Sequence, residues 1–101
     1  MTTHSRLSGL RDHDPLERRR RVADAAGLGL DALAALDPAD GLTLAKADHM
    51  VENVVGLIGI PVGVATNFCV DGFDRLVPMA TEEPSVVAAA SNAARIARAS
   101  G

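Results

Sequence analysis

Residues 52–94 read ENVVGLIGIPVGVATNFCVDGFDRLVPMATEEPSVVAAASNAA, and this stretch decides the fold of the chain. Its aliphatic and β-branched residues favour strands, and Asp71-Gly72 between two such runs is a strong signal for a hairpin turn. We therefore predict strands over residues 64–70 and 73–79. Pro78 lacks a backbone N–H, so it confines the second strand to an edge of the sheet.

A helix is predicted directly after the hairpin. Pro84 suits the first helical position, which puts Glu83 beside the N-cap, and the helix then runs to about Ala99. Its first two turns contain almost only alanine and valine, so the pattern predicts that they are buried on all sides.

The residues before this stretch predict short helices. Asp14-Pro15-Leu16-Glu17 combines a capping carboxylate, a proline at the first helical position and an acid at the third, and Gly27 is a stop signal. A second helical run covers residues 30–36, and Thr43 caps a third over residues 44–51. Residues 1–13 are polar, and we expect an extended arm that a partner orders. The class is thus α+β, with a helical arm over 1–51 and a strand-hairpin-helix segment over 52–101.

Composition limits the function classes and the stability. The chain has 101 residues, 48% of them hydrophobic but only 2% aromatic, so we expect too weak a core for independent folding. A net charge of −3 argues against nucleic acid or an anionic membrane as the main partner. One cysteine, no signal-peptide pattern and no run of about 20 apolar residues predict a soluble, cytoplasmic protein.

Several possible binding motifs are weak. The run Arg18–Arg21 spreads around a helical turn, so we interpret it as a solvated face and not as one anion-binding patch. The histidines and Cys69 lack metal-ligand spacing, which predicts no metal site, and Cys69 is interpreted as a buried, inert thiol. The glycines fit neither dinucleotide nor P-loop patterns.

Glu82 and Glu83 are the residues most suited to chemistry, and two interpretations stay open for them. Both can complement the positive end of the following helix, which composition alone favours. Alternatively their side chains diverge, one toward solvent, and Glu83 carries a proton beside a substrate. Ser85 either binds a ligand oxygen near free helix N–H groups or is an ordinary first-turn serine.

The ordered motifs ENVVG, IPVGVA and DGFDRLVPMATEEPSVVAAASNAA closely resemble the N-terminal part of 3-hydroxy-3-methylglutaryl-coenzyme A (HMG-CoA) reductases, particularly the bacterial class II enzymes. The preceding SRLSGLRDHDPLERRRRV resembles their N-terminal arm and first helix, so the resemblance covers essentially the whole chain. It implies that the chain is the N-terminal portion of their large domain, which binds substrate and dimerises.

The resemblance also implies an activity and site residues. Members of this family interconvert HMG-CoA and mevalonate, releasing coenzyme A and using NAD or NADP. Glu83 matches their catalytic acid, Ser85 matches a residue that contacts the HMG group, and Arg11 matches an arginine near the coenzyme A end. ENVVG matches a segment of the dimer interface, which implies a homodimer or higher homo-oligomer.

This chain departs from the family in two respects. Phe73 and Arg75 follow the hairpin turn where the family usually has a basic and then an aromatic or aliphatic residue. The catalytic lysine, aspartate and histidine and the cofactor-binding domain lie beyond these 101 residues, so we expect the chain alone to be inactive. The alternative is a non-catalytic interaction or oligomerisation module. For a third class, a generic acyl-CoA-binding module, the sequence offers no phosphate or adenine pocket.

Overall fold

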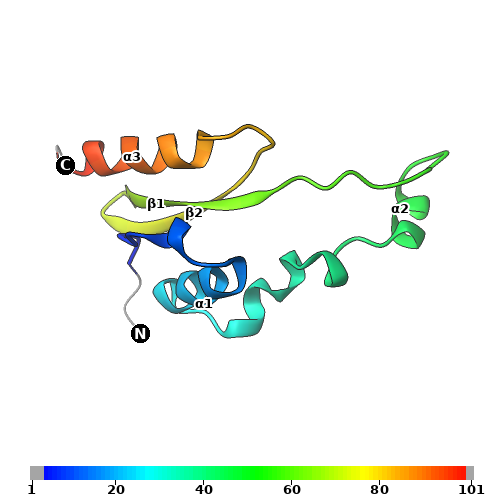
Figure 1. The fold of residues 1–101 in the computed structure, drawn as a ribbon, viewed down its shortest axis with the longest axis horizontal. Helices are drawn as coiled ribbons and strands as arrows, with labels where there is room; N and C mark the ends of the chain where they lie inside the picture. The colour runs from blue at the N-terminus through cyan, green and yellow to red at the C-terminus, as the bar shows by residue number, and fades with distance from the viewer. Residues whose placement is uncertain (1–3, 100–101) are drawn as a thin grey trace.

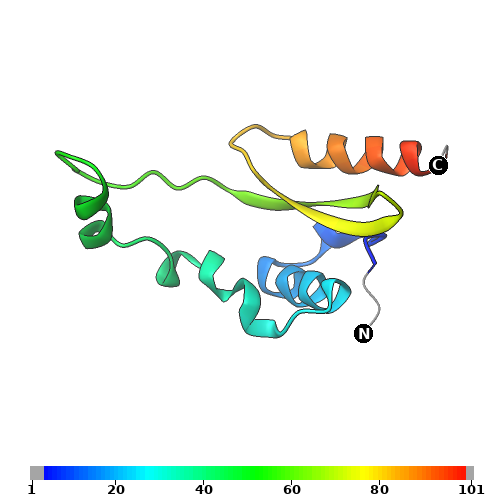
Figure 2. The ribbon, with the colours of Figure 1, turned by 180° about the vertical axis from the view of Figure 1, so that it is seen from behind.

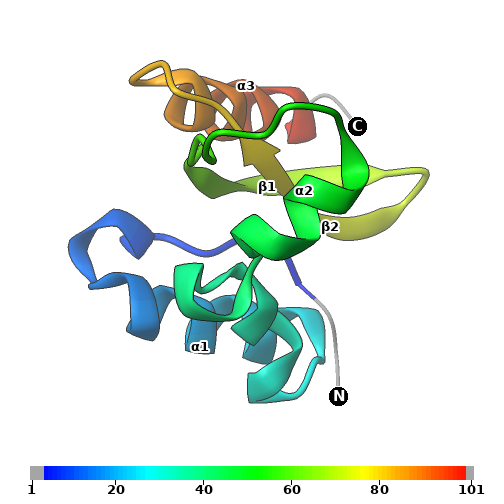
Figure 3. The ribbon, with the colours of Figure 1, turned by 90° about the vertical axis from the view of Figure 1, so that its right-hand side faces the viewer.

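The computed structural model of the protein describes residues 4–99, and its hairpin lies between helices (Figure 1). The described elements, in chain order, are η1 (Leu10–Asp12), α1 (Pro15–Ala26), η2 (Leu30–Leu36), η3 (Pro38–Asp40), α2 (Leu44–Met50), β1 (Val62–Val70), β2 (Phe73–Ala80) and α3 (Val86–Arg98). The η elements are 3₁₀-helices. α3 packs along one side of the hairpin and α1 lies on the other, as the end-on view shows (Figure 3). The predicted α+β class is confirmed.

Local signals set the boundaries of α1. The Asp14 carboxylate accepts a hydrogen bond from the Glu17 backbone N–H at 2.9 Å, and Pro15 occupies the first helical position. Gly27 ends the helix in the left-handed conformation, with φ of 73°. These bounds were predicted and are confirmed. The predicted cap of α2 by Thr43 is confirmed as well, because its hydroxyl accepts from the Lys46 N–H.

The four arginines of α1 separate as predicted. Arg19 pairs with Asp37 at 3.3 Å, whereas Arg20 and Arg21 both pair with Glu17 on their own helix. Their hydrogen bonds and charges, Arg20 foremost, lower the pKa of Glu17 to about 2. Arg18 instead donates to backbone carbonyls of η1.

The hairpin forms where it was predicted and is slightly longer. Asp71 and Gly72 adopt φ values of 52° and 83°, the positive values that a tight hairpin turn requires. The two strands pair in antiparallel register, with Val70 opposite Phe73 at the turn and Val62 opposite Ala80 at the open end.

A bulge interrupts β1, which the sequence did not predict. Ala65 faces Val77 and Phe68 faces Arg75, so two residues of β1 occupy the space opposite one residue of β2. Asn67, the second of these two residues, has φ of 71°. Asparagine tolerates this left-handed conformation better than most residues with a side chain.

Three residues from two distant segments satisfy the backbone groups at this bulge. The Thr66 N–H donates to the Ser91 hydroxyl of α3 at 2.9 Å, and the Asn67 N–H donates to the Ser5 carbonyl at 2.7 Å. The Asn67 carbonyl accepts from the Arg98 guanidinium at 3.0 Å. The bulge therefore joins the N-terminal arm and α3 to the hairpin.

The arm itself is ordered by this chain. Ser5 is 0% exposed, and its hydroxyl donates to the Phe68 carbonyl at 2.7 Å. His4 bonds to the end of α1 through its backbone N–H. Our expectation that a partner orders residues 1–13 is therefore wrong for residues 4–13, because the bulge supplies the missing partners; residues 1–3 lie outside the described residues.

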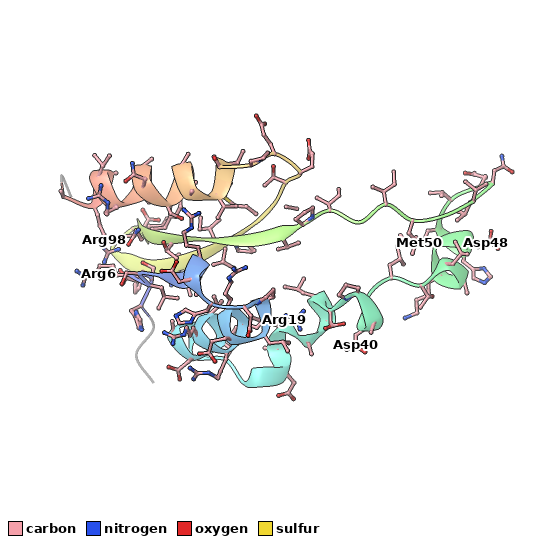
Figure 4. The ribbon with its side chains drawn as sticks, in the orientation of Figure 1. Arg6, Arg19, Asp40, Asp48, Met50 and Arg98 are labelled. Atoms are coloured by element: carbon pink, nitrogen blue, oxygen red, sulfur yellow. The ribbon has the colours of Figure 1, made fainter. Side chains whose placement is uncertain are left out.

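Arg98 and Asp74 form an ion pair that closes this junction. Figure 4 shows Arg98 reaching from the end of α3 toward the hairpin, and its Nη2 lies 2.8 Å from Asp74 Oδ1. The two side chains are 19% and 20% exposed. The Arg98 guanidinium and the Ser5 N–H, which also bonds to the carboxylate, lower the pKa of Asp74 below its ordinary value of 3.8.

The buried core is small. It consists of alanines and one valine: Val22, Ala23, Ala25, Ala47, Ala65 and Ala94. α3 was predicted to be buried on all sides, yet in this chain β1 covers only one side, and Ala88 and Ala89 of its first turns are exposed. The prediction was wrong for the chain by itself.

The molecule is extended because one end projects from the hairpin. α2 and residues 51–61 extend away from the other elements, as both opposite views show (Figures 1 and 2). The radius of gyration is 15.9 Å, against about 13 Å for a compact domain of this length. The accessible surface is 7550 Å², against about 5,400 Å² for a compact monomer of this size. Val55 and Ile58 are 98% and 92% exposed.

The bulge generates a prediction about backbone strain. Replacing Asn67 with valine places a β-branched residue at positive φ, which costs about 1–3 kcal/mol of unfolding free energy. Asn67→Gly is the matched control, because glycine adopts this conformation freely and loses only the side-chain bonds. Urea titrations followed by circular dichroism measure both, and a cooperative transition of the parent chain would contradict our expectation that its core is too weak for independent folding. An equal loss for the two variants would contradict the strain argument.

The Arg98–Asp74 pair predicts a dependence on pH. The pKa of Asp74 is lower in the folded chain than in the unfolded one, so its stabilising contribution is present above the unfolded value and is lost as the pH falls through the folded value. Asp74→Asn should therefore reduce the acid sensitivity of the urea midpoint below about pH 5. The exposed turn residue Asp71, changed to Asn, is the control; an unchanged acid profile in Asp74→Asn would contradict this assignment.

Candidate functional site

An open groove of about 840 Å³ lies at the end of the hairpin where β1 begins and β2 ends. The N-terminal arm, η1 and α1 contribute one part of its lining, and the turn between β2 and α3 contributes another. All three residues that the resemblance selected, Arg11, Glu83 and Ser85, line this groove. The structure thus brings together residues that are more than 70 positions apart in the sequence.

The β2–α3 turn differs from the prediction. Ser85 has φ of 71° and is the N-cap, so α3 begins at Val86 and not at Pro84. A residue in the left-handed conformation cannot continue a right-handed helix, which leaves Pro84 in the turn. The Thr81 hydroxyl supports this turn by accepting from the Glu83 N–H at 3.1 Å.

Ser85 is available to a ligand. Its carbonyl accepts the first bond of α3, from Ala89, but its hydroxyl makes no capping bond to the helix. The side chain is exposed and lies at the helix N-terminus, where backbone N–H groups favour negatively charged oxygens. It is therefore placed to donate to a ligand oxygen, although at the N-cap and not in the first helical turn.

Both adjacent acids line the groove. We expected the side chains of Glu82 and Glu83 to diverge, one toward solvent and one into the space that the turn faces. Both residues contribute to the lining of the groove, and both are exposed. Among the hydrogen bonds of the described residues, neither carboxylate caps α3. The helix-cap interpretation therefore receives no support from a direct bond.

The opposite part of the lining is cationic. Arg11 belongs to η1, which follows Gly9 at φ of 70°, and Arg18 of α1 lines the groove as well. The groove is therefore lined by two arginines from the N-terminal side and two glutamates from the β2–α3 turn. Such a groove suits a ligand with an anionic group at one end and a hydroxyl or carbonyl at the other.

Sequence analysis missed Arg18 because it lies within the arginine run that we interpreted as a solvated face. The signal that could have found it is its spacing from Arg11, since a helix that follows a short turn can return a side chain to that turn.

A close contact shapes the floor of the groove. A Cβ atom at Gly63 would lie 3.0 Å from Cγ2 of Val87, so the absence of a side chain allows α3 to approach β1 here. Val64 and Ser91 line the groove beside them. The glycine among the aliphatic residues of β1 thus allows close packing of α3 on the strand.

The remaining candidates gain no role. Cys69 is exposed and lies one residue before the end of β1, so the prediction of a buried thiol is wrong. Within residues 4–99, no group of three or more potential metal ligands gathers. None of the described helices is both long enough and apolar enough to traverse a bilayer.

Comparisons with known proteins agree on one family. A sequence model described as hydroxymethylglutaryl-coenzyme A reductase matches residues 14–101. The 3-hydroxy-3-methylglutaryl-coenzyme A reductase of Archaeoglobus fulgidus is 54% identical over 97 residues, which are 96% of this chain and 22% of that protein. A probable reductase of Borreliella burgdorferi is 44% identical over 48 residues, covering 48% of this chain and 11% of that protein.

The comparison with solved structures finds the same family. The class II reductase of Streptococcus pneumoniae, solved bound to NADPH in open conformations, superimposes with a TM-score of 0.79 at 37% identity. The match covers 93% of this chain and 26% of that one. The chain therefore spans about a quarter or less of the length of these relatives.

Proposed function

Because the chain belongs to the hydroxymethylglutaryl-coenzyme A reductase family, we propose that it supplies part of the substrate site of an enzyme that interconverts HMG-CoA and mevalonate. The observation that carries this proposal is the groove that Arg11, Glu83 and Ser85 line together. The resemblance matches these three residues to substrate-binding and catalytic positions of the family. The activity of a whole reductase needs parts outside these 101 residues.

Glu83 is proposed as the catalytic acid. Reduction of a thioester or aldehyde carbonyl places negative charge on its oxygen, and an acid within hydrogen-bond reach lowers the barrier by donating a proton there. In the reverse direction the same carboxylate accepts the proton of the alcohol. Glu82 lines the groove too, so it is the matched residue against which this role is tested.

Ser85 and Arg11 are proposed to position the substrate. The Ser85 hydroxyl, exposed at the α3 N-terminus, is suited to donate to the HMG group. The Arg11 guanidinium, in the opposite part of the lining, is suited to the phosphates of coenzyme A. A ligand that spans these two groups would bring its reacting carbonyl toward the acidic turn.

The nicotinamide cofactor does not fit the described residues. The glycines of residues 56–63 lack the spacing of a dinucleotide-binding turn, and Gly63 packs against Val87. The S. pneumoniae relative binds NADPH, so we propose that NAD or NADP binds to other parts of this enzyme. The remaining catalytic lysine, aspartate and histidine are proposed to come from those parts as well.

A homodimer or higher homo-oligomer is also proposed. The motif ENVVG, residues 52–56, lies within the projecting segment, in which Val55 and Ile58 are almost fully exposed. A contiguous segment with apolar side chains this exposed is typical of an interaction surface. Burial against a second copy of the chain would remove these side chains from water. A cytoplasmic enzyme is consistent with this proposal.

The alternative function is a non-catalytic interaction module. It is favoured by one observation, that the apolar side chains of Val55 and Ile58 are almost fully exposed. In that case the exposed apolar segment would serve association and the groove would hold no substrate. The two functions predict different activities for a reductase in which this chain replaces the matching segment. The first predicts an active enzyme and the second an inactive one.

We predict that Glu83→Gln removes activity from such an enzyme. In a chimaeric A. fulgidus reductase that carries this chain in place of its matching segment, mevalonate oxidation should fall by about 10²–10⁴-fold, because a neutral amide cannot exchange the proton. Steady-state kinetics and sedimentation should show lost turnover with an unchanged oligomer. Glu82→Gln is the control and should retain activity; substantial turnover in Glu83→Gln would remove the role.

We also predict that the 101-residue chain alone does not oxidise NADH or NADPH in the presence of HMG-CoA, because one of the four catalytic residues is present. The measurement is the absorbance of the reduced nicotinamide, with the chimaeric enzyme as the positive control. Turnover above the blank would contradict the inference that the other parts are required.

A further inference from the structure

Arg18 contacts the turn that carries Arg11, and this contact has no role in the function proposed so far. Its Nε donates to the Leu10 carbonyl at 3.1 Å, and its Nη2 donates to the Arg11 carbonyl at 3.0 Å. We propose that Arg18 is a positioning residue that holds η1 so that Arg11 lines the substrate groove. This inference rests on the proposed function, because Arg11 matters there as a substrate-binding residue.

The geometry of the contact suits arginine in particular. Two consecutive carbonyls of a 3₁₀ turn are held by two N–H groups of one planar guanidinium. Lysine, with a single ammonium on a flexible stem, does not reproduce this fork. The Leu10 carbonyl also accepts from the His13 N–H at 3.3 Å, so Arg18 reinforces a bond that closes the turn.

Hydrogen bonds in the first turn of α1 hold the backbone of Arg18 in place. Its own N–H donates to the Asp14 carbonyl at 2.9 Å in the first turn of α1, and the Asp14 carboxylate caps that helix. η1 has no comparable support, since it is three residues long and its N-cap Gly9 offers no side chain. The helix therefore acts as the fixed element and the turn as the element that it orders.

The neighbouring arginines do not share this contact. Arg19 pairs with Asp37, and Arg20 pairs with Glu17 on the surface of the same helix. Arg20 therefore provides a matched control, with the same side chain on the same helix but no bond to η1 and no place in the groove lining.

Because Arg18 also lines the groove, its action through Arg11 must be separated from direct contact with the substrate. A double-mutant cycle does this. If Arg18 acts by placing Arg11, then Arg18→Met should raise KM for HMG-CoA in the wild-type background and have no further effect in an Arg11→Ala background. Direct contact would make the two effects multiply.

The experiment uses the chimaeric A. fulgidus reductase described above. Arg18→Met should raise KM for HMG-CoA by about tenfold, the size expected for a lost charge-assisted contact, while kcat changes little. Arg18→Lys should recover part of the loss, and Arg20→Met should match the parent enzyme. A fall in kcat with KM unchanged, or effects of Arg11→Ala and Arg18→Met that multiply, would overturn the inference.

A readout independent of activity accompanies the kinetics. The Asp12 and His13 N–H groups close η1 by donating to Gly9 and Leu10, so Arg18→Met should speed hydrogen exchange at these two amides and leave α3 unchanged. Unchanged exchange in η1 would overturn the positioning role. If Arg11→Ala leaves KM unaltered, the proposed substrate role of Arg11 fails, whereas faster exchange at η1 would still support the structural part of the inference.

Discussion

The bulge at Thr66 and Asn67 is the constraint on which the rest of this structure depends. A bulge leaves backbone groups of β1 without partners on β2, and buried unpaired groups cost about 1–3 kcal/mol each. Ser5, Ser91 and Arg98 provide those partners from the two ends of the chain. The buried core is made almost entirely of alanine. This polar junction therefore holds the elements together, a role that large aromatic side chains have in other small domains.

The junction also explains where the groove forms. The N-terminal arm is attached at Ser5, and α3 is attached at Ser91, so both run from the bulge toward the open end of the hairpin. There the arm leads into η1, and the turn before α3 places its two acids. The contacts at the bulge therefore fix the distance between the cationic and the acidic parts of the groove, although they lie away from both.

The sequence predicted the features that neighbouring residues determine. Asp14-Pro15 and Asp71-Gly72 define a helix start and a hairpin turn through contacts within a few positions, and both were confirmed. The contacts at the bulge, around Ser5 and with Arg98 join residues up to 93 positions apart. Sequence periodicity contains no signal for such contacts. The start of α3 was misplaced because Pro84 favours a first helical position, whereas the left-handed Ser85 places it in a turn.

The same distinction applies to the candidate site. Local pattern could nominate Glu82 and Glu83 but favoured a cap, and family resemblance was needed to prefer Glu83; the participation of Arg18 required the geometry of η1. The exposure of the site points in the same direction. Glu83 is exposed, and so is the apolar segment around Val55. A general acid acts within hydrogen-bond reach of its substrate, in a site from which water is excluded. Under the proposed function, other parts of a reductase would cover both surfaces and exclude water from the acidic turn.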